Sequence, residues 1–256
     1  MYCGPSTDQV VSGFPPSPGL RIMAPATNRR QRVQTGSSLT YSAEIRWFLQ
    51  GTAPAGLRDA YFGDTPNAAQ RIDEYVLLPG CDATGIKLRE GRLEVKARTR
   101  APEAVSYGAT IAGRRDGWIK WSRPAADGAA LRALVSNPVD DWLFVAKTRR
   151  LRKFAPRGRG FVEIEPTELA ARGYQAELCA LRAFRGRQSG RPRSLDDFAG
   201  TPSWYSICVE AFGDSLVSLA ELDTAVAHLL AGGFRAELPA RASSSYPAWL
   251  AGFLTD

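Results

Sequence analysis

The chain has 256 residues, of which 44% are hydrophobic, so it can bury the core of one large domain or two small ones and is not disordered throughout. Its 33 Lys and Arg against 26 Asp and Glu give a net charge of +7, which favours an anionic partner such as a phosphate, a nucleotide or a nucleic acid. The single histidine, His228, argues against sites built from several histidines. Carboxylate, lysine, arginine and tyrosine side chains must therefore carry any chemistry.

The cysteines and the apolar stretches indicate the cellular compartment in which the protein is expected. The four cysteines are spread along the chain without a Cys-x-x-Cys pair, which argues against a zinc site or a disulfide framework. No stretch reaches the ~18 uninterrupted apolar residues that suggest a membrane span, and the N-terminus lacks the basic flank and apolar run of a secretory signal. We therefore expect a cytoplasmic protein that has no contact with a membrane.

Residues 1–40 are rich in prolines, glycines and polar residues and contain four arginines. They show no sustained apolar period. We expect them to form a disordered basic arm, and residues 41–256 to form a single domain. Eight segments of this domain are rich in Val, Ile, Trp, Tyr and Phe and are separated by Gly, Pro, Asp or Ser, which predicts strands. The predicted strands are residues 43–49, 71–78, 85–90, 92–99, 117–123, 142–151, 174–183 and 204–212.

Helices are expected at residues 166–172, 194–199, 214–230 and 246–254. In the longest of them, Asp214 or Ser215 is expected at the N-cap, and Gly232 can end the helix. Pro247 suits the first turn of the last helix.

The most informative stretch runs from Gly85 to Arg98. With Glu90 and Gly91 as a two-residue turn, it predicts a β-hairpin whose period-two alternation puts five cations and one carboxylate on one face and apolar residues on the other. The charged face consists of Lys87, Arg89, Arg92, Glu94, Lys96 and Arg98. Like charges on adjacent strands repel one another, so this face requires either full solvation or a bound anion.

Charged and apolar residues alternate in the other predicted strands as well. The alternating charges are Glu44, Arg46, Arg71, Asp73, Lys120, Lys147, Arg149, Glu177 and Glu210. Eight such strands can turn their charge outward to water, or they can close with the charge inward while helices cover the apolar exterior. The second arrangement suits a polyphosphate bridged by divalent cations. We therefore predict a mainly β (α+β) fold, a closed eight-stranded antiparallel β-barrel with residues 214–230 and 246–254 as outer covering helices.

Residues 44–213 resemble the CYTH, or triphosphate tunnel metalloenzyme, superfamily, whose members include triphosphatases and class IV adenylate cyclases. The order of short patterns carries the resemblance. Glu44-Ile-Arg46 is similar to the family's opening Glu-x-Glu-x-Lys strand, Lys87-Leu-Arg89 to its basic Arg-x-Arg strand, Lys96 to the single lysine of the next strand, and Lys147-Thr-Arg149 to the later Lys-x-Arg. Glu177 and Glu210 fall where the family places its last acidic strands. The opening strand departs from the family, because Arg46 replaces a glutamate that is a metal ligand and Phe48 replaces the lysine.

The resemblance implies a metal-dependent triphosphatase, which binds and hydrolyses a triphosphate or polyphosphate inside the charged barrel. In this hypothesis Glu44, Glu177 and Glu210 are the catalytic residues and also hold Mg²⁺ or Mn²⁺. The cations expected to bind the phosphates of the substrate are Arg46, Lys87, Arg89, Lys96, Arg98, Lys120, Lys147 and Arg149.

Two other functions stay open. Arg46 at a metal-ligand position favours a non-catalytic module that binds a phosphate or nucleotide in the same tunnel. The basic runs at 147–159 and 182–193, with Trp118, Trp121 and Phe154 as stacking candidates, suggest a nucleic-acid-binding protein instead. No recognised nucleic-acid-binding motif accompanies these runs, which disfavours that alternative. The natural substrate and the oligomeric state do not follow from the sequence.

Overall fold

The computed structural model describes residues 37–63, 69–125, 142–186 and 192–254, which all belong to one compact unit. The expected disordered arm, residues 1–40, lies outside the described residues up to residue 36. Its last residues belong to the first strand instead, because β1 already begins at Ser38.

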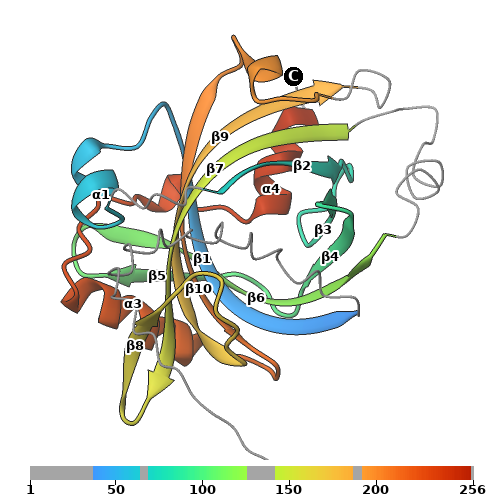
Figure 1. The fold of residues 1–256 in the computed structure, drawn as a ribbon. Coiled ribbons are helices and arrows are strands. Elements are labelled where there is room, and N and C mark those ends of the chain that lie inside the picture. The colour runs from blue at the N-terminus through green and yellow to red at the C-terminus, as the bar shows by residue number, and fades with distance from the viewer. Residues whose placement is uncertain (1–36, 64–68, 126–141, 187–191, 255–256) are drawn as a thin grey trace, which may run out of the picture. The chain divides into compact units, whose positions relative to one another are not determined.

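Ten strands form one antiparallel sheet, and eight of them close into a barrel (Figure 1). The strands are β1 (Ser38–Gln50), β2 (Ala69–Val76), β3 (Thr84–Arg89), β4 (Arg92–Arg98), β5 (Glu103–Tyr107), β6 (Ile111–Pro124), β7 (Trp142–Arg157), β8 (Gly160–Ile164), β9 (Arg172–Gly186) and β10 (Ser203–Gly213). The order around the barrel is β1-β10-β9-β7-β2-β3-β4-β6, and β6 pairs with β1 to close it. β5 and β8 lie outside this ring, paired with β6 and β7 respectively. The predicted eight-stranded barrel is therefore confirmed.

Each of the eight predicted strands is one strand of the barrel, although several are longer than predicted. β5 and β8 were not predicted, and the reason is that each pairs on one side only and leaves much of its surface to solvent, so neither needs a strong apolar pattern. The predicted helix at 166–172 is wrong. This segment is a short turn between β8 and β9, with β9 beginning at Arg172.

Three α-helices are described, α1 (Ala55–Ala60), α3 (Leu219–Ala231) and α4 (Tyr246–Ala251), of which α1 was not expected. The predicted helix at 194–199 is a 3₁₀ turn at Asp196–Phe198, and a second 3₁₀ turn at Gly252–Leu254 follows α4. α3 starts later than predicted, because Ser218 and Glu221 form a capping box in which each side chain bonds the other's backbone N–H. No described helix is long and apolar enough to cross a membrane.

The alternation in β1 shows which way the barrel wall faces. Ile45 and Trp47 point outward into the main apolar cluster, where they meet Leu222, Val226 and other residues of α3. Glu44 and Arg46, one residue away from them, line the lumen. The charged face of the strands thus points inward and the apolar face points outward, as in the second of the two arrangements that the sequence allowed.

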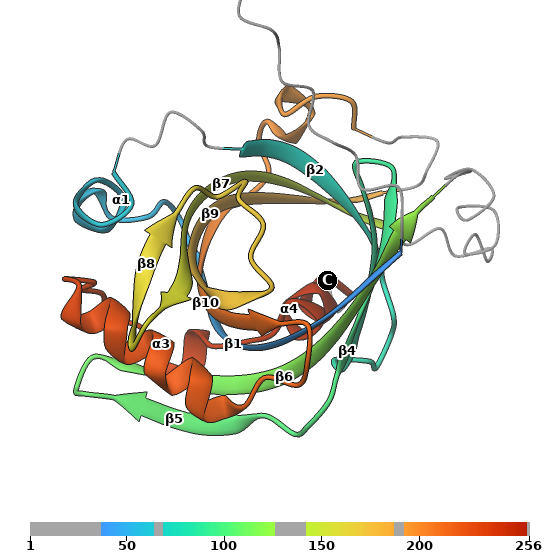
Figure 2. The same ribbon diagram turned by 60° about the horizontal axis from the view of Figure 1, so that its bottom comes forward.

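The last helix does not cover the outside of the barrel, as was expected. Figure 2 looks into the ring of strands and shows α4 inside it, whereas α3 lies outside. The ring of Trp249 stacks on Phe48 of β1 at 4.5 Å between centroids, and Tyr246 stacks on Tyr75 of β2 at 5.6 Å. Because this end of the lumen is lined by apolar residues of β1, β2, β7 and β9, it can bury the apolar side chains of α4. α4 therefore fills one end of the barrel.

Candidate functional site

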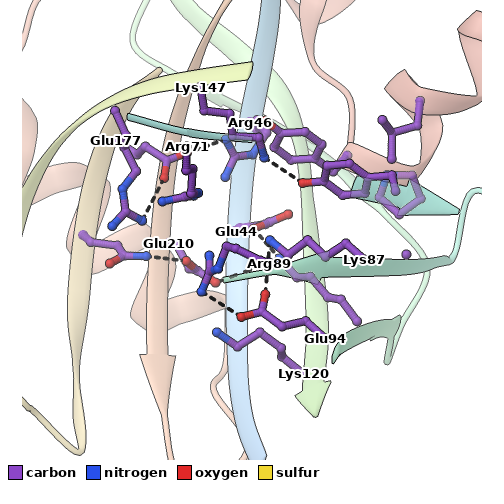
Figure 3. Close-up of a pocket in the computed structure, with 18 residues that line it drawn as sticks. Glu44, Arg46, Arg71, Lys87, Arg89, Glu94, Lys120, Lys147, Glu177 and Glu210 are labelled. Atoms are coloured by element: carbon purple, nitrogen blue, oxygen red, sulfur yellow. Dashed lines mark hydrogen bonds and ion pairs between the residues drawn. The ribbon is translucent and has the colours of Figure 1, made fainter. Parts of the chain in front are cut away.

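The lumen holds a cavity of about 250 Å³ (Figure 3). All the site residues predicted from the sequence line it, with the exception of Arg98. They are Glu44, Arg46, Lys87, Arg89, Lys96, Lys120, Lys147, Arg149, Glu177 and Glu210. Arg71, Tyr75, Gly85, Glu94, Gln175 and three residues of α4 complete the lining.

The β3–β4 hairpin supplies one side of the cavity. Glu90 (φ 49°) and Gly91 (φ 73°) form the predicted two-residue turn, which puts Lys87 opposite Glu94. The Glu94 carboxylate accepts ion pairs from Lys87 at 3.1 Å and from Arg89 at 2.7 Å. Burial alone would raise the pKa of Glu94, but these two cations lower it to about 2. Glu94 is therefore ionised at neutral pH and neutralises part of the cationic charge of the hairpin.

Asp73 on β2 joins the cations at the closed end of the cavity. Its side chain is fully buried, with Lys147 Nζ at 2.8 Å, Lys87 Nζ at 3.3 Å and Arg71 Nε at 3.1 Å. Burial opposes its ionisation, yet these three cations hold the pKa of Asp73 well below its usual value. The alternation of Arg71 and Asp73 was visible in the sequence, but their part in the cavity follows from β2 lying between β7 and β3.

Lys147 is the most deeply buried cation of the cavity. Its ammonium group contacts Asp73 and donates a hydrogen bond to the hydroxyl of Tyr75 at 2.7 Å, and it lies 4.1 Å from the centre of the Tyr246 ring. Burial, together with Lys87 and Arg71 nearby, outweighs Asp73 and lowers the pKa of Lys147 to about 7. A small change in the charge around it therefore changes its protonation at neutral pH.

The three predicted metal ligands are each bound by other side chains. Glu44 accepts an ion pair from Lys96 at 2.6 Å, and Glu177 accepts one from Arg46 at 2.8 Å. Glu210 accepts a hydrogen bond from the Gln175 amide at 2.6 Å, and Lys96 lies 3.9 Å from its other oxygen. Although burial alone would raise the pKa of Glu177, Arg46 and Arg149 hold it well below its usual value.

The strand register places Asp116, which was not predicted as a site residue, next to the acids of the cavity. Glu44 lies directly opposite Glu210 on β10 and opposite Asp116 on β6, so three acids form a row across adjacent strands. Lys96 pairs with Glu44, and Arg98 pairs with Asp116 at 3.0 Å. Among the described residues, no three His, Cys, Asp or Glu side chains are grouped so that they could hold a metal ion. As these carboxylates stand, each held by a cation or an amide, they do not fit a Mg²⁺ or Mn²⁺ site.

Lys120 differs from the other cations of the cavity. It lies directly opposite Lys96 across β4 and β6, and it makes no ion pair or hydrogen bond with any residue that the structure describes. Burial lowers the pKa of Lys120, and the nearby carboxylates of Glu94 and Glu210 oppose this lowering without reversing it, while Arg89 and Lys87 lower the pKa further. In all, eight Lys and Arg side chains line the cavity against four glutamates. The cavity thus has an excess of positive charge that the described residues do not balance.

Arg98 is the predicted site residue that lies apart from the cavity lining. Its guanidinium pairs with Asp116 and Asp82 and reaches Ser245, the N-cap residue of α4, at 3.4 Å. This set of contacts connects β4 with the start of α4. Arg98 therefore has a structural position at the filled end of the barrel.

The two basic runs do not form one exposed surface. In the first, Lys147 and Arg149 point into the lumen, whereas Arg152 on the other face pairs with Glu163 at 2.7 Å. Of the second run, residues 187–191 lie outside the described residues. Trp118 and Phe154 are buried, so neither is open to a stacked base.

Comparison of the chain with known family models finds no match, and comparison with curated proteins finds none either. The resemblance to the CYTH superfamily remains a hypothesis from the sequence patterns.

Proposed function

We propose that the barrel binds a triphosphate or a short polyphosphate inside its lumen, and that lysine and arginine side chains hold this anion without a bridging metal ion. The observation that carries the proposal is Lys120, a cation inside the cavity with another lysine opposite it and without an ion pair or hydrogen bond to any described residue. A bound anion would supply the missing partner.

The distribution of charge supports a ligand with several negative groups. Lys87 and Arg89 on β3 and Lys120 on β6 lie on the two sides of β4, and their donors converge on the same space (Figure 3). Arginine gives two parallel hydrogen bonds to a phosphate and lysine gives a mobile point charge, and both are stronger in a partly desolvated site than in water. Such a ligand also reduces the repulsion between the cations, and this reduction contributes to the binding free energy in addition to the direct contacts.

The volume supports a compact ligand. At about 250 Å³, the cavity lies slightly below the range of roughly 300–1,000 Å³ that is usual for drug-sized ligands. A triphosphate group is small and highly charged and suits such a space. A whole nucleoside triphosphate would leave its base and sugar outside.

Thermal unfolding with and without inorganic triphosphate tests the proposal. In EDTA, triphosphate at 100 times its Kd should raise the free energy of unfolding by about 2.7 kcal/mol, and sodium sulfate at equal ionic strength should not. Lys120→Met should remove half or more of this stabilisation. Arg159→Met, a charge removal at an exposed turn, is the matched control and should keep it. Absence of any shift for the unmodified protein in EDTA contradicts binding without metal.

Metal-dependent hydrolysis is the second candidate, and the row of Glu210, Glu44 and Asp116 is the observation that favours it. A divalent cation would have to displace Lys96 and Arg98 from these acids. Release of phosphate from triphosphate, assayed with Mg²⁺, with Mn²⁺ and with EDTA, tests this candidate. Hydrolysis that requires the metal and is lost in Glu44→Gln would support this candidate. If micromolar protein releases no phosphate, anion binding is the function that still stands.

A further inference from the structure

The outer face of β7 and β9 is covered at two places and open between them. At the first place, Leu57 of α1 and the nearby Phe62 belong to the same apolar cluster as Leu178 of β9, and Figure 2 shows α1 outside the ring of strands. At the second place, Phe198 of the 3₁₀ turn belongs to one cluster with Ala146 of β7. Between the two covers lies a cavity of about 360 Å³, which we call the outer groove.

The floor of the outer groove consists of small side chains. Thr148 on β7 lies directly opposite Ala180 on β9, and Ala180 is exposed. The next outward-facing rows of the two strands place Arg182 at one end of this floor and Arg150 at the other. These two rows are about 13 Å apart along the strands, because each strand residue adds about 3.3 Å. The floor is therefore long enough for an elongated ligand.

Arg182 is a cation that the chain holds in place without neutralising it. Its Nη1 donates hydrogen bonds to the carbonyl oxygens of Phe198 and Thr201, both at 3.3 Å. Both acceptors are uncharged, and Arg182 has no ion pair with any residue that the structure describes. A guanidinium has five N–H donors in a fixed fork, so the two carbonyl groups do not use all of them. Arg182 therefore offers an oriented positive charge to an anion in the outer groove.

The other charges of the outer groove also favour an anion. Arg150 donates a hydrogen bond to the carbonyl oxygen of Gly63, and Arg58 of α1 pairs with Asp59 at 2.7 Å. Arg58, and to a smaller extent Arg150, lower the pKa of Asp59, so this carboxylate is ionised and offsets one of the arginine charges. The described residues that line the outer groove include three arginines and no Asp or Glu.

We propose that the outer groove is a second binding site, separate from the lumen, for a small organic anion that has one oxyanion head group on an elongated apolar body. Arg182 binds two oxygens of the head group, as the fork of an arginine does with a carboxylate. The body lies over Ala180 toward Leu178. The volume falls within the range of roughly 300–1,000 Å³ that is usual for small-molecule sites. An inorganic phosphate has no apolar surface to bury on this floor, so the outer groove selects against it.

Displacement of a fluorescent apolar anion from the whole protein tests the proposal. The fluorescence of 8-anilinonaphthalene-1-sulfonate should rise when it binds and fall again when sodium octanoate is added. Octanamide has the same chain without the charge, so it should displace the probe about 10- to 100-fold less effectively than octanoate. Inorganic triphosphate should not displace the probe, which separates this site from the lumen.

Two variants locate the site. Arg182→Met should make octanoate and octanamide equally effective, whereas Arg159→Met, at an exposed turn, should keep the difference between them. Ala180→Leu fills the floor and should weaken both ligands by about tenfold. Ala171→Leu, at an exposed alanine apart from the groove lining, should weaken neither. If Arg182→Met weakens both ligands by one factor, Arg182 only supports the 3₁₀ turn and the proposed contact with the head group is wrong.

Three results with the unmodified protein would overturn the proposal. They are no rise in fluorescence, equal displacement by octanoate and octanamide, and displacement of the probe by triphosphate, which would place the probe in the lumen. The binding of triphosphate in the lumen is tested separately by thermal unfolding of Lys120→Met, so either site can fail without the other.

Discussion

Lys96 on β4 and Lys120 on β6 lie directly opposite each other, and both line the lumen of the barrel. Like charges in this position destabilise a pair of strands by about 0.2–1 kcal/mol. Glu44 pairs with Lys96 at 2.6 Å, whereas Lys120 forms no ion pair with a described residue and is attracted only by the more distant Glu94 and Glu210. The folded protein therefore carries an electrostatic cost inside its cavity, and a bound anion would remove it.

Lys120→Met should change stability and binding in opposite directions. Without ligand, the variant should be slightly more stable, because it loses a half-buried charge whose burial is not offset by an ion pair or a hydrogen bond. Its affinity for triphosphate should fall by about 10- to 100-fold, which corresponds to the roughly 1.5–3 kcal/mol of a hydrogen bond to a charged group. Urea unfolding and calorimetric titration measure the two effects. A variant that is less stable and binds normally would assign Lys120 a structural role.

Lys147 should make the free energy of unfolding depend on pH. Its pKa is about 7 in the folded protein and, in the unfolded chain, about 10.4. Between these values the unfolded chain holds a proton that the folded protein lacks, so the free energy of unfolding should rise as the pH increases from about 7 to 10. Lys147→Met should reduce this rise. Urea unfolding at intervals between pH 7 and 10 measures this rise. If the free energy of unfolding rises equally steeply with pH in the variant, Lys147 is not its source.

Glu177→Gln should destabilise the protein strongly. Arg46 and Glu177 form an ion pair whose side chains are almost fully buried, so loss of one partner leaves a buried charge and costs about 3–5 kcal/mol. Replacing both residues, as Arg46→Met with Glu177→Leu, should recover part of that loss, since the buried charge of Arg46 is removed together with its partner, whereas the partly exposed Arg149 loses its ion pair with Glu177. Urea unfolding of the unmodified protein and the two variants tests this. If the double variant is no more stable than Glu177→Gln, the loss does not come from an unpaired Arg46.

Arg98→Met separates a structural residue from the binding residues. Arg98 contacts Asp82, Asp116 and Ser245 outside the cavity, so the variant should unfold at lower urea concentration, while its Kd for triphosphate stays within about twofold of the original. Ser245→Ala, which removes the N-cap of α4, should also destabilise the protein, by about 1 kcal/mol. A large loss of affinity in Arg98→Met would instead extend the binding site to the region of Asp116.

The barrel strands and the inward charge could be predicted because each strand carries its own pattern. Alternation with period two reports which residues share a face, and the turn at Glu90 and Gly91 fixes the register of β3 and β4. Most cations of the cavity were found from this signal alone.

The partners of those cations could not be predicted in the same way. That Asp73 meets Lys147 depends on β2 pairing with β7, and that Asp116 lies beside Glu44 depends on β6 closing the barrel onto β1. Both are pairings between distant segments. The position of α4 was predicted wrongly because its apolar residues suit an outer surface and a lumen equally well. Tyr246 of the cavity was missed for the same reason.

A crystal structure of the protein with inorganic triphosphate, grown in EDTA, tests the central claim most directly. The account predicts difference density for the phosphate chain inside the barrel, with phosphate oxygens within hydrogen-bond distance of Lys120, Arg89 and Lys147. Density for triphosphate only on the outer surface of the barrel, with the lumen unchanged, would contradict it.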